Sequence, residues 1–153
     1  MSARIGVGYD SHRFERGRRL VLGGVEVEFE LGLAGHSDAD VLTHALIDAL
    51  LGAARLGDLG THFPDSDERW RDADSLDMLT TVLGELPGPV LNADATVVCD
   101  EPRLDQHRAE MERILSEALS APVSVKATTN EGMGWIGRGE GIACVAVALI
   151  DAG

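Results

Sequence analysis

The sequence predicts an α+β fold: a two-layer sandwich with a mixed four-stranded sheet, helices on one face, and a small hairpin. Four short apolar runs, at 4–10, 91–98, 123–128 and 142–150, have the length and composition of strands. Segments with helical periodicity lie between these runs. The chain has 153 residues, 44% hydrophobic and 25% charged, which suits a single globular domain over 1–153.

A hairpin is predicted after the first strand. Apolar and polar residues alternate over 19–22 and 25–29, on either side of Gly23-Gly24. A Gly-Gly pair between two alternating segments is typical of a tight hairpin turn.

A long helix is predicted from Asp38, as its N-cap, to about Arg55, after a loop at 31–37. Apolar residues at helical spacing form a stripe along this helix, which predicts that one of its sides packs against the sheet. The stripe consists of Val41, Leu42, Ala45, Leu46, Ala49, Leu50 and Ala53.

Further segments complete the two layers. Residues 56–75 form a long polar loop, and such a length in a compact domain indicates a functional loop or short helical turns. A second helix covers 76–86 and ends at Pro87, and a third covers 104–119. The long apolar run at 142–150 is typical of a central, buried strand.

Composition argues against several classes of protein. The net charge of −13 disfavours a nucleic-acid partner, because phosphate backbones require a basic face. No apolar run approaches the roughly 20 residues of a membrane helix, and no signal-peptide hydrophobic segment follows Met1. We therefore expect a cytoplasmic protein without membrane contact, in which Cys99 and Cys144 are free buried thiols.

Asp10 and His12 are candidate metal ligands at the end of the first strand. Residues i and i+2 of a strand point to the same side, so a carboxylate and an imidazole lie next to each other there. His44, one turn into the long helix, is the candidate third ligand. One carboxylate and two imidazoles leave a fourth position open, as in catalytic zinc sites. The alternative is that these are solvated polar residues.

Asp40 and Asp48 flank His44 at i−4 and i+4, on the same face of the predicted helix. Either carboxylate can accept the ring N–H that a metal leaves free, which fixes the tautomer and orientation of the imidazole. The alternative is ordinary surface charge on a helix.

Two polar regions on either side of this helix can hold a ligand. His36 and Ser37, with backbone N–H groups at the start of the helix, can bind an anion or simply cap the helix. Asp58, Asp65 and Asp67 in the long loop can contact the hydroxyls of a polyol-like ligand, or serve as turn and cap residues.

A third polar region follows the strand at 123–128. Thr129 and its neighbours offer hydroxyl and backbone N–H groups that can cradle phosphate, and Glu131 can hold a hard cation such as Mg²⁺. Arg138, in a glycine-rich segment, is either a ligand-binding cation or a surface arginine. The glycine spacing matches no P-loop or dinucleotide fingerprint.

Together, these spaced motifs resemble the 2-C-methyl-D-erythritol 2,4-cyclodiphosphate synthases, from residue 4 to about residue 150. The matching motifs are Gly6-x-Gly8-x-Asp10-x-His12-x-Phe14, His36-Ser37-Asp38-x-Asp40-Val41-x-x-His44-Ala45, Ala53-Ala54-x-Leu56-Gly57-Asp58, Phe63-Pro64-Asp65, Val125-Lys126-Ala127-Thr128-Thr129-x-Glu131 and Gly137-Arg138-Gly139-Glu140-Gly141-Ile142-Ala143.

The resemblance implies an enzyme, a phosphorus–oxygen lyase of non-mevalonate isoprenoid biosynthesis. Such enzymes convert 4-diphosphocytidyl-2-C-methyl-D-erythritol 2-phosphate into the cyclic diphosphate and release CMP. The resemblance also implies a homotrimer with active sites between neighbouring subunits. A central cavity of that trimer, near Trp135 and Arg138, can hold an isoprenoid diphosphate.

The resemblance further implies two divalent metals. Zn²⁺ is expected at Asp10, His12 and His44, and Mg²⁺ or Mn²⁺ at Glu131, with the diphosphate. In such a reaction the 2-phosphate attacks the β-phosphorus within one molecule, so no protein nucleophile is required.

Two residues, His36 and Thr129, are implied to support the transition state, and a larger set to bind substrate. Asp58 and Asp65 are expected near the methylerythritol hydroxyls. The implied substrate-binding set is Asp10, His12, His36, Ser37, Asp58, Leu59, Gly60, Phe63, Asp65, Asp67, Asp100, Glu101, Pro102, Arg103, Leu104, Ala127, Thr128, Thr129, Asn130, Glu131, Trp135 and Arg138, with the cytidine near 100–104 and 127–129.

Three positions depart from the family pattern. Asn130 stands where a third Thr is common, Gly132-Met133 where Lys-Leu is common, and Trp135-Ile136 where Phe-Thr is common. The absent Lys is expected to weaken phosphate binding unless Arg103 or Arg138 compensates, and the indole is expected to reshape the trimer cavity.

Two other functions stay open at this point. One is a non-catalytic trimeric module that binds a metal or a nucleotide. The other is a metal-dependent phosphohydrolase, which activates water on the same zinc. The open zinc coordination and the Thr-Thr-x-Glu segment favour the cyclising enzyme over the binding module.

Overall fold

The computed structural model describes residues 1–153 and contains a five-stranded sheet in the order β4-β1-β7-β5-β6. The strands are β1 (Ala3–Glu15), β4 (Gly32–Leu33), β5 (Val90–Val98), β6 (Val123–Thr128) and β7 (Gly141–Asp151). All neighbours are antiparallel except β5 and β6. The predicted mixed sheet is confirmed, but it has a fifth strand.

The fifth strand, β4, falls in the segment that the sequence predicts as a loop. Its two residues pair with the end of β1, through Phe14 with Leu33 and Glu15 with Gly32. A strand of two residues leaves no alternation pattern to detect, so a loop was the wrong prediction there. The predicted hairpin is present as a separate two-stranded sheet of β2 (Leu20–Leu22) and β3 (Val25–Val27).

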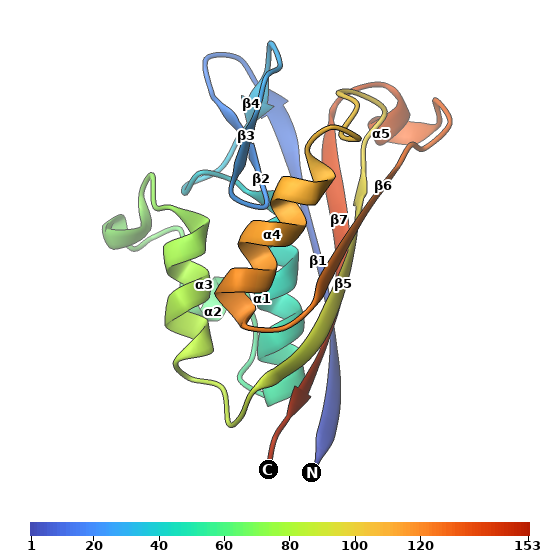
Figure 1. The fold of residues 1–153 in the computed structure, drawn as a ribbon. Coiled ribbons are helices and arrows are strands. Elements are labelled where there is room, and N and C mark those ends of the chain that lie inside the picture. Colours follow the sequence, from blue (N-terminus) through green and yellow to red (C-terminus); the bar gives the residue numbers. More distant parts are fainter.

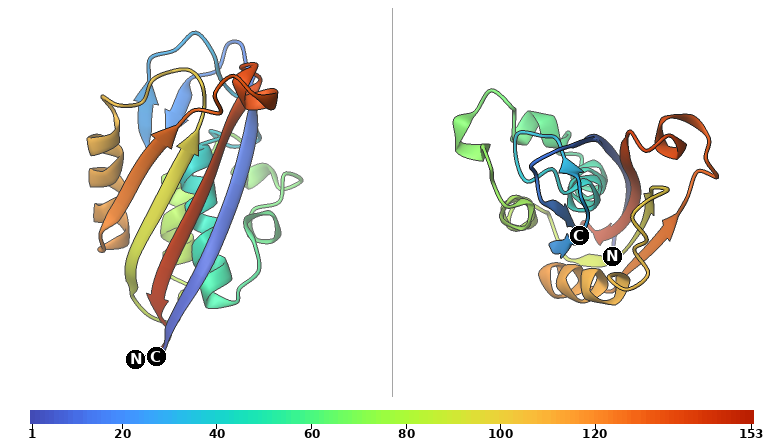
Figure 2. Two further views of the ribbon diagram at one scale, coloured as in Figure 1. Left: turned by 90° about the vertical axis from the view of Figure 1, so that its right-hand side faces the viewer. Right: turned by 90° about the horizontal axis from the view of Figure 1, so that it is seen from above.

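Three helices cover one face of the sheet, as predicted: α1 (Val41–Ala54), α3 (Ser75–Leu83) and α4 (Arg108–Leu119). Figure 1 shows them together on one side of the strands, and in the left view of Figure 2 none of these three helices covers the other face of the sheet. The third helix begins four residues later than predicted, because residues 104–107 form a turn closed by the His107 N–H donating to the Leu104 carbonyl at 2.9 Å.

The remaining elements are short. The long loop between α1 and α3 contains α2 (Leu59–His62) and a 3₁₀ turn η1 (Glu68–Trp70), in agreement with the expected helical turns. The glycine-rich segment before β7 contains α5 (Gly134–Gly137). No helix in the structure is both long and apolar enough to cross a membrane.

Strand β1 is longer than the predicted 4–10, because β7 pairs with it from Ala3 to Arg13. Asp10 and His12 therefore lie within the strand and not at its end. Gly6 and Gly8 face the helices on the same side as Asp10 and His12, because side chains alternate along a strand.

Helix α1 lies directly against β1 because two glycines leave room for its backbone. A Cβ atom added at Gly6 would lie 1.9 Å from the Ala49 carbonyl oxygen, and one at Gly8 would lie 1.8 Å from the Ala45 carbonyl oxygen. Any side chain at either position would push the helix away from the strand. The pair of glycines therefore sets the distance between β1 and the helix that carries His44.

Asp40, and not the predicted Asp38, caps α1. Its carboxylate accepts hydrogen bonds from the Thr43 N–H at 3.0 Å and from the N–H groups of Gly23 and Gly24 at 2.8 and 2.9 Å. Asp40 thus joins the hairpin turn to the start of α1. Helix α1 is buried on nearly every side, beyond the predicted stripe, because α3 and β2 pack on the sides that the sheet leaves free.

We expect Gly8→Ala to lower the free energy of unfolding by about 3 kcal/mol or more, because the new methyl group would overlap the α1 backbone. Urea denaturation of the purified variants measures this change. Gly52→Ala is the matched control: Gly52 lies on α1, and a Cβ there meets nothing closer than 3.9 Å. The control should gain about 0.5–1 kcal/mol from its helix propensity. A Gly8→Ala protein as stable as the wild type would contradict the proposed packing constraint.

Candidate metal centre and ligand cavity

The structure brings Asp10, His12 and His44 together into one cluster. Each offers one ligand atom, and these atoms all lie within 4.8 Å of one another. Asp10 Oδ2 lies 2.8 Å from His12 Nε2 and 3.2 Å from His44 Nδ1. One carboxylate oxygen and two imidazole nitrogens on packed strand and helix backbones form a set that can hold a divalent metal ion.

The orientation of His12 supports metal binding. Its Nδ1 lies 2.8 Å from the Ala34 carbonyl oxygen, which only accepts, so Nδ1 donates and Nε2 of the neutral ring carries a lone pair. That lone pair is buried, has no hydrogen-bond partner of acceptable geometry, and faces the Asp10 carboxylate. Two electron-rich groups this close require a proton or a metal ion between them. The residues present therefore fit a bound cation.

The charges within the cluster stabilise one another. Burial disfavours a charged Asp10, but contacts with His12 and His44 outweigh burial and lower the pKa of the Asp10 carboxyl. Burial likewise disfavours a charged His12, but the adjacent Asp10 carboxylate outweighs it and raises the pKa of that imidazole. Asp10 is thus kept as a carboxylate, the form that ligates a metal.

The predicted partners of His44 are wrong. Asp40 is used for capping α1, and the Asp48 carboxylate accepts the Leu59 N–H at 2.7 Å. His44 Nε2 instead lies 2.8 Å from Ser75 Oγ and 3.2 Å from Ser37 Oγ. The i±4 rule places residues along one helix face, whereas Nε2 of His44 points toward the loop before α1, at Ser37, and the start of α3, at Ser75.

A cavity of about 550 Å³ opens beside the cluster. The sequence-predicted residues that line it, besides the three ligands, are His36, Ser37, Leu59, Gly60, Phe63 and Asp65. Five residues that no sequence motif indicated also line it: Arg13, Ala34, Gly35, Trp70 and Met78. The Trp70 ring packs edge-on against Phe63, with ring centroids 4.7 Å apart. An aromatic residue inside a polar loop was the available signal for Trp70.

Two of the predicted loop aspartates have structural contacts. Asp58 lies beside the cluster in a smaller adjoining cavity and caps α2, where it accepts the Thr61 N–H at 2.9 Å. Asp67 does not line the main cavity. Its carbonyl oxygen lies 3.0 Å from Nε2 of His36, and its carboxylate pairs with Arg69. Asp67 thus contributes to the cavity by holding His36.

The predicted residues of 100–104 and 127–131 do not reach the metal cluster within one chain. Asp10 pairs with Cys144, which pairs with Val97, which pairs with Ala127, so β6 lies three strands from β1. At about 4.8 Å per strand, this row spans about 14 Å. Thr129 and Glu131 are exposed at the far side of the sheet.

Asp100 joins the two loops at that far side. Its carboxylate accepts the backbone N–H of Asn130 at 2.8 Å and of Gly132 at 2.9 Å. The residues 100–104 and 129–132 therefore form one surface, although they are distant in sequence. Arg103, a candidate for compensating the absent Lys, pairs with Asp105 at 2.9 Å.

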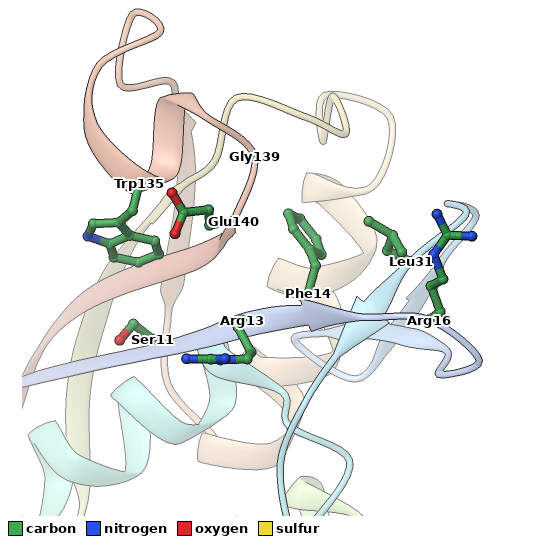
Figure 3. Close-up of a pocket in the computed structure, with 8 residues that line it drawn as sticks. All are labelled: Ser11, Arg13, Phe14, Arg16, Leu31, Trp135, Gly139 and Glu140. Carbon is green, nitrogen blue, oxygen red and sulfur yellow. The ribbon is translucent and has the colours of Figure 1, made fainter.

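A second cavity, of about 720 Å³, lies beside Trp135, Gly139 and Glu140 of the glycine-rich segment. Figure 3 shows Trp135 and Glu140 next to each other, opposite Ser11 and Arg13 of β1. Trp135 thus lines a cavity, whereas Arg138 is exposed and pairs with Glu140 at 2.6 Å.

The fold and the site define a class: an α+β sandwich protein with a carboxylate–imidazole cluster that can hold a metal ion, beside a cavity. A family model described as the YgbB family matches residues 3–151, and the chain belongs to that family. A protein of Syntrophomonas wolfei named 2-C-methyl-D-erythritol 2,4-cyclodiphosphate synthase is 55% identical, over 97% of this chain and 98% of that protein.

Solved structures agree with this family. A structure of 2C-methyl-D-erythritol-2,4-cyclodiphosphate synthase in its CDP-bound form has a TM-score of 0.88 and 37% identity, over 97% of this chain and all of that one. The bifunctional IspDF from Campylobacter jejuni has a TM-score of 0.92 and 37% identity, over 97% of this chain. This chain spans 42% of that bifunctional protein.

We expect Zn²⁺ to raise the melting temperature of chelator-treated protein, because a ligand that binds only the folded state stabilises it. The gain is about 2.7 kcal/mol at a free metal concentration 100 times Kd. Differential scanning calorimetry across a zinc titration measures it. His12→Ala should abolish the gain, whereas His107→Ala, which changes a histidine outside the cluster, should keep it. Equal gains in both variants would place the metal elsewhere.

Proposed function

We propose that this chain converts 4-diphosphocytidyl-2-C-methyl-D-erythritol 2-phosphate into 2-C-methyl-D-erythritol 2,4-cyclodiphosphate and CMP, as a phosphorus–oxygen lyase with 1–153 acting as one domain. The observation that carries the proposal is the Asp10/His12/His44 cluster beside a cavity of about 550 Å³. That cluster occurs in a member of the YgbB family whose named relatives are such synthases.

The reaction forms one phosphorus–oxygen bond and breaks another. An oxygen of the 2-phosphate attacks the β-phosphorus of the same molecule, the bond from that phosphorus to the α–β bridging oxygen breaks, and CMP leaves with the electron pair. No atom is oxidised or reduced. Because both reacting groups belong to one molecule, the protein must bring two anions together and stabilise the developing charge.

Two metal sites are part of the proposal. Asp10, His12 and His44 would hold Zn²⁺, and Glu131 would hold Mg²⁺ or Mn²⁺ together with the diphosphate. Bound metals supply Lewis-acid stabilisation of charge on phosphoryl oxygens. His36, which lines the cavity, and Thr129, which is exposed at the far side of the sheet, would add hydrogen bonds to the phosphoryl oxygens.

The chain's own residues would orient the rest of the substrate. The carboxylates of Asp58 and Asp65 can accept hydrogen bonds from the methylerythritol hydroxyls, with Phe63 beside them. The joined surface of 100–104 and 129–132, together with the adjacent end of β6 at 127–128, would hold the cytidine. The CDP-bound structure of the related synthase supports a cytidine nucleotide as part of the substrate.

Each active site would combine two copies of the chain in a homotrimer. The separation of the metal cluster from Thr129 and Glu131 supports this arrangement, because a diphosphate group is much shorter than the about 14 Å between β1 and β6 and would have to reach both proposed metal sites. The helix-free face supports it as well. Three apolar cross-strand pairs of β1 and β7 lie on that face, where Ile5 and Tyr9 are 71% and 55% exposed: Ile5–Leu149, Val7–Val147 and Tyr9–Val145.

An isoprenoid diphosphate would occupy the cavity beside Trp135 in such a trimer. Phe14, Leu31 and Trp135 offer apolar contacts, and Arg13 and Arg16 can pair with phosphate oxygens (Figure 3). The large indole is compatible with a cavity of about 720 Å³.

We expect the purified chain to produce CMP and a cyclic diphosphate from the cytidyl substrate with Mg²⁺, and phosphorus NMR identifies the product. His44→Ala should lower turnover at least about 100-fold, because the metal loses a ligand. His107→Ala is the control and should keep wild-type activity. Linear phosphate products would instead support a metal-dependent phosphohydrolase, and the absence of turnover would support a binding module.

Two inactive variants should restore each other if the sites lie between chains. His44→Ala damages only the metal half, and Glu131→Gln damages only the far half. In randomly mixed trimers, about one quarter of the sites combine two undamaged halves. Co-expression of the two variants with different affinity tags should therefore recover about a quarter of wild-type activity. No recovery in purified mixed trimers would show that both halves come from one chain.

A further inference from the structure

We propose that Ser75 and Asp38 are positioning residues that orient His44 toward the metal through a chain of hydrogen bonds. The proposal rests on the metal site of the proposed function. It concerns two residues outside the ligand set, one on the loop before α1 and one at the first position of α3.

The three side chains form a continuous chain of contacts. His44 Nε2 lies 2.8 Å from Ser75 Oγ. The Ser75 hydroxyl donates to Asp38 Oδ1, and the Ser75 N–H donates to Asp38 Oδ2 at 3.0 Å. Ser75 is fully buried, and His44 nearly so. Low dielectric strengthens these hydrogen bonds and leaves no water to replace them.

The direction of each hydrogen bond follows from the chemistry of the groups. A carboxylate only accepts, so the single hydroxyl proton of Ser75 goes to Asp38. Ser75 Oγ can then only accept from His44, which places the ring proton on Nε2. Nδ1 is left with its lone pair, and Nδ1 is the nitrogen that faces Asp10 Oδ2 at 3.2 Å. The Asp38 carboxylate thereby selects, through Ser75, the His44 tautomer whose Nδ1 can ligate a metal.

The chain of contacts is itself held in place from outside. The Asp38 N–H donates to the Ala73 carbonyl at 3.0 Å, and the Asp40 N–H donates to Asp38 Oδ1 at 3.1 Å. Ser37 Oγ, 3.2 Å from His44 Nε2, gives the ring proton a second acceptor. The His44 ring is therefore constrained at the end opposite the metal.

Helix capping does not account for the Ser75 hydroxyl. The N-cap of α3 is Asp74, whose side chain accepts the Leu76 N–H at 2.9 Å. The Ser75 hydroxyl contacts only Asp38 and His44. A buried hydroxyl between a carboxylate and a ligating imidazole is the pattern of an outer-shell partner that tunes a metal ligand.

The test measures zinc affinity without substrate, by competition with a chromophoric chelator. We expect Ser75→Ala to weaken zinc binding roughly 10–100-fold, the usual cost of removing such a partner. Asp38→Asn should also weaken it, because the neutral amide no longer fixes the hydroxyl proton. Thr80→Ala, which removes an exposed hydroxyl from the same helix, is the matched control and should bind zinc like the wild type.

Two further readouts separate positioning from a merely structural role. In the zinc-loaded wild type, proton–nitrogen NMR should show a protected Nε2–H of His44, and Ser75→Ala should lose it. A variant with a lower metal-free melting temperature but wild-type zinc affinity would overturn the proposal. Wild-type zinc affinity and a retained Nε2–H signal in Ser75→Ala would overturn it too. If the wild type binds zinc but makes no cyclic product, the positioning role stands and the proposed function fails.

Discussion

The close contact between α1 and β1 is the constraint on which the site depends. Gly6 and Gly8 let the α1 backbone approach the strand, with carbonyl oxygens where a Cβ atom would otherwise lie. Asp10 and His12 continue the same face of β1, and His44 precedes the contacting residue Ala45 in α1. The ligand atoms lie within 4.8 Å of one another, and a helix displaced by even one side chain could not keep that distance. The close packing that Gly6 and Gly8 allow is therefore also what brings the three candidate ligand atoms together.

Strand β1 serves two purposes because its side chains alternate. One face carries the two glycines, Asp10 and His12 toward α1, and the other carries Ile5, Val7 and Tyr9 on the helix-free side. A shift of one residue in the pairing with β7 would exchange the two sets, so the long antiparallel pairing protects both. In the proposed trimer, the same strand would join the metal site to the subunit interface, and assembly would complete the site.

Much of the fold followed from local patterns, and the remainder depended on contacts between distant residues. Alternation and helical periodicity identified the strands, the hairpin and the three main helices, and the spacing of Asp10, His12 and His44 identified the cluster. The two-residue β4 has no pattern of its own, and the strand β1 extends past its apolar part because β7 continues beside it. Ser75 is 31 residues from His44, and its contact arises only when α3 packs beside α1. The i+4 spacing made Asp48 a plausible partner for His44, but in the folded chain the Asp48 carboxylate accepts the Leu59 N–H instead.

The charge distribution determines how a chain with a net charge of −13 would accept the proposed polyanionic substrate. Most arginines near the candidate regions pair with acidic neighbours, as Arg69 does with Asp67, Arg103 with Asp105 and Arg138 with Glu140. Arg13 is the one arginine or lysine that lines the metal cavity. In the proposed function, the attraction for phosphate would therefore come mainly from bound cations, which the half-buried Asp10 and the exposed Glu131 would help to hold. The acidity of the chain and its proposed substrate would be compatible because metal ions, held in part by His12 and His44, would lie between the protein and the phosphates.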